Sequence, residues 1–146
     1  MKNKSFTTCI DVALPAEDVF NHIKAIPKWW TTDFEGQSSN LNDEFTIRHG
    51  DVHYSKQKLI EVIPGKKLVW LVTDCRLNWI EKNKTEWTNT KMIFELTGDG
   101  DITTLKFTHE GLVPEKECYG RVAESWELVI KENLYNFIAK GEGNNI

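Results

Sequence analysis

The last stretch of the chain, from Pro114 to Lys140, constrains the fold most, because it is typical of one long amphipathic helix. At about 100° per residue, its apolar side chains fall on one arc of roughly 140° and its charged side chains fall opposite. The arc holds Tyr119, Val122, Ala123, Trp126, Val129, Ile130, Leu134 and Phe137. An apolar helix face must be covered by another layer of structure. We therefore expect the rest of the chain to supply a sheet that packs on this helix.

One strongly polar side chain, Asn133, lies within the apolar arc, beside Trp126 and Val129. A buried amide without hydrogen-bond partners lowers stability. Asn133 therefore needs either partners inside the protein or a ligand, and the pattern leaves both alternatives open.

Length and charge exclude several classes of protein. The 146 residues predict a single domain over residues 1–146, and the net charge of -4 comes from acidic and basic residues mixed along the chain. No basic stripe for nucleic acid is present. The sequence has no apolar run of about 18 residues and no signal peptide, so we expect no membrane span and a cytoplasmic location. Three widely spaced cysteines, Cys9, Cys75 and Cys118, predict reduced thiols.

The first third of the chain predicts a strand, two short helices and a loop. Ser5 to Leu14 alternates between apolar and polar residues, the period of a strand. Pro15 is suited to open a helix, and Pro27 ends it. The pair Trp29 and Trp30 follows, predicted to lie in a second short helix, and the polar stretch 36–42 predicts a loop.

From Glu44 onward the pattern predicts consecutive antiparallel hairpins. If Gly50-Asp51 is a two-residue turn, one face of the first hairpin carries Phe45, Ile47, His49, Val52, Tyr54 and Lys56. Thr90 to Leu96 and Ile102 to Glu110 are predicted to be half-buried strands. Leu68 to Trp79 is apolar on both faces, so its inward face stays open.

These elements predict an α+β helix-grip fold: a curved antiparallel sheet of about six strands wrapped around the long C-terminal helix, with two short helices after strand one. A cavity between sheet and helix would be lined by polar groups on the inward faces and by apolar neighbours. The candidate ligand-binding residues are His49, Tyr54, Lys56, Trp70, Phe94, Phe107, His109, Tyr119, Val122, Trp126, Val129 and Asn133. The alternative is that the polar groups bond to each other or stand at the cavity rim.

No metal, cofactor or catalytic site is predicted. In a two-residue hairpin His49 and His53 point to opposite faces, which disfavours a shared metal ion. Ser55 and Lys58 match the S-x-x-K pattern of acyl enzymes, but on a strand the two side chains diverge. No phosphate-binding glycine loop or nucleophile elbow is present.

Several segments together resemble a known family. They are Leu14 to Phe20, the Trp29-Trp30 pair, Val62 to Trp70, and Phe107 to Pro114 followed by Trp126. In this order they resemble the SRPBCC, or START/Bet v 1-like, superfamily, and within it the domain of the activator of Hsp90 ATPase homologue 1. The resemblance covers nearly the whole chain. It implies a cavity between the sheet and the terminal helix, and a role as a small-molecule binder, a co-chaperone module or, in some members, an enzyme.

Three functions follow as hypotheses. The first is a cytoplasmic binding protein for a small hydrophobic or amphipathic molecule held between the sheet and the C-terminal helix. The second is an interaction module that contacts a chaperone or another protein through its outer surface. The third is an enzyme with His109 or His49 as general base, a suitable residue type without a partner constellation. Fold alone does not choose among them.

Overall fold

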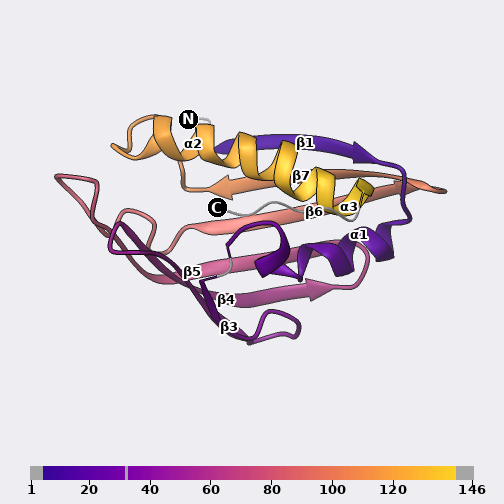
Figure 1. The fold of residues 1–146 in the computed structure, drawn as a ribbon, viewed down its shortest axis with the longest axis horizontal. Coiled ribbons are helices and arrows are strands. Elements are labelled where there is room, and N and C mark those ends of the chain that lie inside the picture. Colours follow the sequence, from indigo (N-terminus) through magenta and orange to yellow (C-terminus); the bar gives the residue numbers. More distant parts are fainter. Residues whose placement is uncertain (1–4, 32, 141–146) are drawn as a thin grey trace.

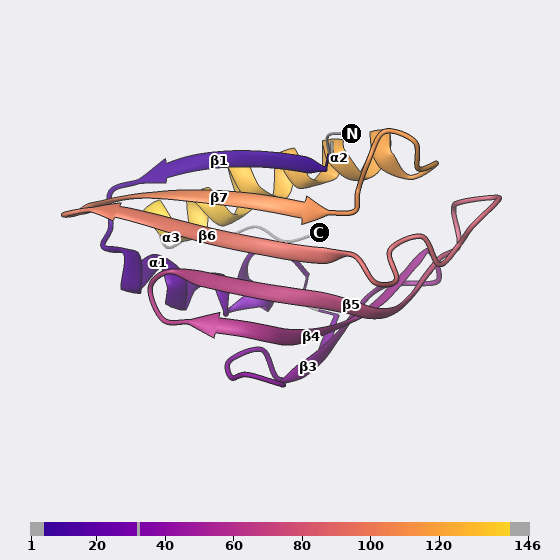
Figure 2. The same cartoon turned by 180° about the vertical axis from the view of Figure 1, so that it is seen from behind.

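Helices cover one face of a single antiparallel sheet, and the other face is open (Figures 1 and 2). The computed structural model describes residues 5–31 and 33–140. Among these residues seven strands occur, in the order β1-β7-β6-β5-β4-β3-β2. The strands are β1 (Phe6–Val12), β2 (Phe34–Gly36), β3 (Glu44–His49), β4 (His53–Ile63), β5 (Lys67–Leu77), β6 (Lys91–Asp99) and β7 (Ile102–Glu110). The helical segments are α1 (Ala16–Ile23), η1 (Ile26–Lys28), α2 (Tyr119–Leu128), η2 (Val129–Leu134) and α3 (Tyr135–Lys140). The predicted helix-grip fold is confirmed, with β2 as a strand beyond the expected six.

The strands beside the C-terminal helix have the faces that their alternation predicts. In β1 every second residue is buried, from Phe6 to Val12. In β6 and β7, Phe94 and Phe107 point inward and their ring centroids lie 5.0 Å apart. The face of β5 that the sequence left open is now assigned, because Trp70 is buried together with Leu68 and Val72. These side chains form the core under the helix.

The β3–β4 hairpin differs from the prediction. His49 pairs with His53, so the turn contains residues 50–52, one more than the two expected. A shift of one residue moves every side chain of a strand to the other face. Tyr54 and Lys56 therefore lie on the outer face: Tyr54 donates a hydrogen bond to Asp74 (3.2 Å), and the Lys56 ammonium lies 3.1 Å from Glu44. Their assignment to an inner cavity was wrong.

The C-terminal helix begins at Tyr119 and runs diagonally across β1, β7 and β6 (Figure 1). The segment η2 is a π-helix, in which the hydrogen bonds span one more residue than in an α-helix. This segment buries four residues, Val129, Ile130, Asn133 and Leu134. No helix within the described residues is long and apolar enough to cross a membrane.

Candidate functional site

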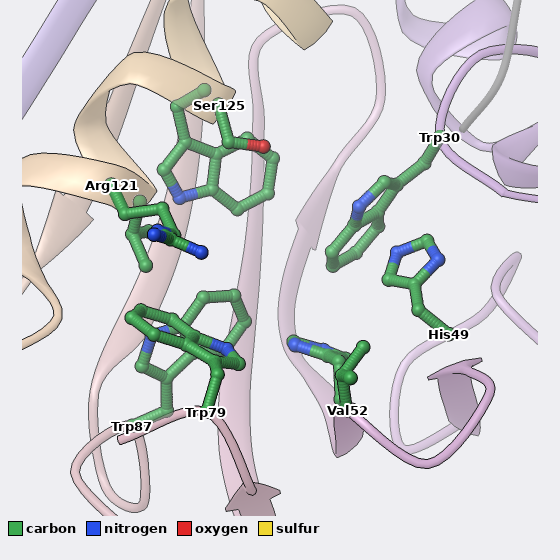
Figure 3. A pocket seen from close by; sticks show the side chains of 10 residues that line it. Trp30, His49, Val52, Trp79, Trp87, Arg121 and Ser125 are labelled. Carbon is green, nitrogen blue, oxygen red and sulfur yellow. The ribbon is translucent and has the colours of Figure 1, made fainter. Parts of the chain in front are cut away.

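A pocket opens where the β3–β4 turn, the β5–β6 connection and the start of α2 meet. Its volume is about 300 Å³. Figure 3 shows Trp79, Trp87 and Arg121 on one side of it, opposite Trp30, His49 and Val52. Four segments distant in sequence thus supply the walls. We call this site the tryptophan pocket; it is lined by Trp30, His49, Val52, His53, Trp79, Trp87, Arg121, Val122, Ser125 and Trp126.

Four indole rings form most of the walls. Trp87 stacks on Trp126 with ring centroids 6.3 Å apart and planes 17° apart. Trp126 in turn lies 5.1 Å from Trp30. Trp30 stacks nearly parallel on the core residue Trp70, at 6.1 Å. Three of the pocket indoles are buried and continuous with the core, whereas Trp79 is half-buried at the mouth. The walls are therefore held by core packing.

His109 lies behind two of these indoles. It is fully buried, and its Nδ1 accepts a hydrogen bond from the Trp126 indole N–H (3.1 Å). Its Nε2 lies 2.8 Å from the Thr90 hydroxyl, which itself donates to the Trp87 carbonyl (2.6 Å). Because the hydroxyl proton is used there, Nε2 must carry the imidazole proton and donate it to Thr90. Burial, with a smaller effect of the Lys116 charge, lowers the pKa of His109 to about 3.

The neutral imidazole of His109 therefore supports the pocket wall through its hydrogen bonds to Trp126 and Thr90. Both ring nitrogens have protein partners, so neither is free to take a proton from a bound molecule. This geometry gives no support to the hypothesis that His109 acts as a general base.

His49 and His53 stand side by side at the pocket. Their ring centroids lie 5.4 Å apart, which contradicts the expectation that they point to opposite faces. The three-residue turn explains the error, because it pairs the two residues directly. Burial lowers the pKa of His49, against the opposing effect of Asp33. Burial also lowers the pKa of His53, and the neighbouring His49 lowers it further. Both rings are therefore neutral near pH 7.

Beneath the pocket, a short chain of hydrogen bonds fixes the ring of His53. Its Nε2 lies 2.9 Å from the Ser55 hydroxyl, and this oxygen accepts a hydrogen bond from the Gln57 amide (2.6 Å). The Gln57 carbonyl oxygen is buried and has no partner within the described part of the chain. The His53 ring is thus held against the pocket wall from below.

A metal centre needs more ligands than the histidine pair supplies. In the portion of the chain that the structure describes, no three His, Cys, Asp or Glu side chains gather within reach of one ion. Two imidazoles alone fall short of the three or four protein ligands usual for zinc. The absence of a metal stays a prediction, and it rests on the small number of ligands instead of on the direction of the two rings.

The structure brings together three of the predicted site residues. His49, Val122 and Trp126 line the tryptophan pocket. The others do not line it. Trp70, Phe94, Phe107, His109 and Val129 belong to the core, Tyr119 is half-buried at the start of α2, and Tyr54 and Lys56 lie outside.

For Asn133, both alternatives set by the sequence stay predictions. It is buried in η2, but it does not line the tryptophan pocket. Among residues 5–31 and 33–140, no hydrogen-bond partner of its amide is found.

Sequence reasoning missed most of the pocket. Trp79 and Trp87 lie in an irregular, charged connection that carries no periodic signal, and Arg121 was placed on the solvent face of the helix. Trp30, His53, Val52 and Ser125 were also missed. The available signal was compositional: two tryptophans within a polar segment need covering by another part of the fold.

The curved sheet, the helix across it and the pocket between them define a helix-grip protein of the SRPBCC, or Bet v 1-like, class. The family model "Activator of Hsp90 ATPase homolog 1-like protein" matches residues 13–139, so the chain belongs to this family. A search of curated protein sequences gives no match.

Solved structures agree on the fold. The Aha1 dimer from Colwellia psychrerythraea is similar with a TM-score of 0.76 and 19% identity, over 98% of this chain and 100% of that chain. CalU16 from Micromonospora echinospora has a TM-score of 0.67 and 16% identity, over 94% and 75% of the two chains. DynU16, a putative protein in the dynemicin biosynthetic locus, has a TM-score of 0.66 and 14% identity; 97% of this chain is covered but 49% of DynU16. At these identities the likenesses show the fold alone.

Proposed function

We propose that the protein binds a small, largely apolar molecule in the tryptophan pocket, between the sheet and α2. The observation that carries the proposal is a space of about 300 Å³ walled by four indoles. Small-molecule sites are typically concave and mostly apolar, with a few polar groups that orient the ligand. Here His49, His53 and Arg121 supply those groups.

The pocket is held in shape by the protein itself. The hydrogen bonds from Trp126 to His109, and from His109 through Thr90 to the Trp87 carbonyl, fix two of the walls. Binding to a formed site avoids the free energy of ordering its side chains. A rigid apolar space of this kind favours flat, ring-shaped molecules over flexible chains.

The test is a titration with phenylnaphthylamine, an uncharged dye whose fluorescence rises in apolar sites. Ser125 is exposed on α2 and lines the pocket, so Ser125→Phe fills the space without removing a core side chain. Glu124→Phe, at the neighbouring exposed position outside the pocket, is the matched control. We expect Ser125→Phe to weaken binding by at least about tenfold and Glu124→Phe to leave it within about twofold. Absence of dye binding to the wild type, or equal binding by both variants, would overturn the proposal.

An interaction module is the second candidate. It is supported by the family and by the exposed apolar residue Val52, which is 53% exposed at the pocket rim. Such a module would bind a chaperone or another protein and leave the pocket empty. Native mass spectrometry of the purified protein separates the two functions: a co-purified small molecule supports the pocket, and its absence beside a bound protein supports the module.

Three expectations stay predictions alongside this proposal. They are the single domain over residues 1–146, the cytoplasmic location and the lack of a cofactor. The proposal includes no catalytic step.

A further inference from the structure

The charges around the tryptophan pocket are unequal. Of its ten lining residues, Arg121 carries a full positive charge and none carries a negative one. His49 and His53 add hydrogen-bonding groups without charge, since burial lowers the pKa of each. The guanidinium is therefore the one full charge that the ten lining residues present to a bound molecule.

Arg121 is placed to use this charge. Its guanidinium carbon lies 5.3 Å from the centre of the Trp79 ring, a cation–π contact that fixes the side chain at the mouth. Figure 3 shows the group pointing over the paired indoles toward the space between the two walls. A guanidinium has five N–H donors, and a cation–π contact uses none of them as a hydrogen bond.

In the part of the chain that the structure describes, these donors have no protein partner. Within the described residues, Arg121 has neither an ion-pair partner nor a side-chain hydrogen bond. By contrast Arg48, on the outer face, pairs with Glu35 at 3.2 Å. An unpaired guanidinium beside an apolar pocket is suited to a carboxylate or sulfonate, which it can bind through two hydrogen bonds.

We propose that the molecule bound in the tryptophan pocket is an aromatic or other flat-ring anion, with its rings between the indoles and its carboxylate or sulfonate on Arg121. This rests on the proposed function and adds the charge of the ligand. A cage of indoles also suits an organic cation, but the guanidinium at the same mouth repels one. The positive charge at the mouth selects the anion.

Two dyes with the same ring skeleton test the charge. Anilinonaphthalene sulfonate carries a sulfonate, and phenylnaphthylamine lacks it. We expect Arg121→Gln to weaken binding of the sulfonate dye about three- to tenfold and to leave the uncharged dye within about twofold, the range for one charge-assisted contact near solvent. Arg121→Lys should restore part of the loss. Raising the salt from about 50 mM to about 500 mM should weaken the sulfonate dye alone, since screening acts on charge.

The matched control is Arg76→Gln, which removes the same charge from an exposed position of β5, outside the tryptophan pocket. It should leave the binding of both dyes unchanged. Three outcomes would overturn the inference. In Arg121→Gln, both dyes could lose affinity equally or neither could lose any; in Arg76→Gln, the sulfonate dye could lose affinity. These outcomes differ from failure of the proposed function, in which phenylnaphthylamine itself does not bind or Ser125→Phe does not displace it.

Discussion

His109 shows at the scale of one residue how the fold uses a polar side chain that the sequence marked as a site residue. The alternation of β7 places it inward, and that placement is confirmed. Its partners Thr90 and Trp126 come from other parts of the chain, and they leave it fully buried and neutral. A buried imidazole satisfied at both nitrogens stabilises the neutral form and penalises the charged one.

This predicts a loss of stability in acid. In the folded protein the pKa of His109 is about 3, below the ordinary 6.5. An unfolded chain takes up a proton as the pH falls through the ordinary value, whereas the folded chain does not until about 3. The contribution of neutral His109 to the free energy of unfolding is therefore complete above about pH 6.5 and is lost as the pH falls toward 3. Over this range the free energy of unfolding changes with a slope approaching about 1.4 kcal/mol per pH unit for this group.

Urea unfolding from about pH 7.5 to about pH 5 measures the slope. His49 and His53 add in the same direction, because their pKa values are also lowered. His109→Gln should reduce the slope of the free energy of unfolding against pH by up to the contribution of one histidine. Phe107→Leu, a core change without a titrating group, should lower stability but keep the wild-type slope. An unchanged slope in His109→Gln would contradict the assignment.

At the scale of elements, the end of β7 and the start of α2 hold the pocket walls. Gly111 follows β7 with φ of +101°, a conformation that other residues rarely adopt. An added Cβ there would lie 2.8 Å from Thr90 Cγ2. Thr90 is the residue that bonds to His109, so this glycine protects the support behind Trp126.

Gly111→Ala should therefore lower the free energy of unfolding by more than about 1 kcal/mol, through backbone strain and displacement of Thr90. Gly120→Ala is the control, because Gly120 lies in α2 and a Cβ there meets no atom within 4 Å. It should keep stability or raise it by up to about 1 kcal/mol through helix propensity. Thermal melts of both variants decide the point, and equal behaviour of the two would refute it.

For the whole molecule, the C-terminal helix closes the fold. It covers the buried faces of β1, β7 and β6 on the side shown in Figure 1, while Figure 2 shows the opposite face of the sheet without a helix. Phe107 and Trp126 are in contact across this interface, with ring centroids 4.5 Å apart. Loss of the helix would expose apolar side chains of the sheet, Phe107 among them.

A chain ending at Pro114 should therefore not fold. At about 25 cal/mol per Å² of apolar surface, the loss of cover over Met92, Phe94, Leu105 and Phe107 removes several kcal/mol, comparable with the whole stability of a small domain. Circular dichroism and a thermal melt of the truncated protein test this. A soluble fragment with a cooperative transition would contradict the role of the helix.

The sequence by itself determined the elements with strong periodicity. The apolar arc around Trp126 and the alternation in β1, β6 and β7 specify which faces are buried, because one buried face leaves no freedom in the phase of a strand or helix. The resemblance carried by the Trp29-Trp30 pair and by Phe107 to Pro114 agreed with the family that the comparison shows.

Only the tertiary structure decided the site. One extra residue in the β3–β4 turn moved the side chains of β4 to the faces opposite those predicted, taking Tyr54 and Lys56 outside and bringing His53 beside His49, while β3 kept its predicted faces. Pattern cannot detect this, because both faces of that hairpin mix polar and apolar residues. The tryptophan pocket joins Trp30, Trp87 and Arg121 from segments without a common period. Their proximity follows from chain packing across long sequence separations, which no local pattern records.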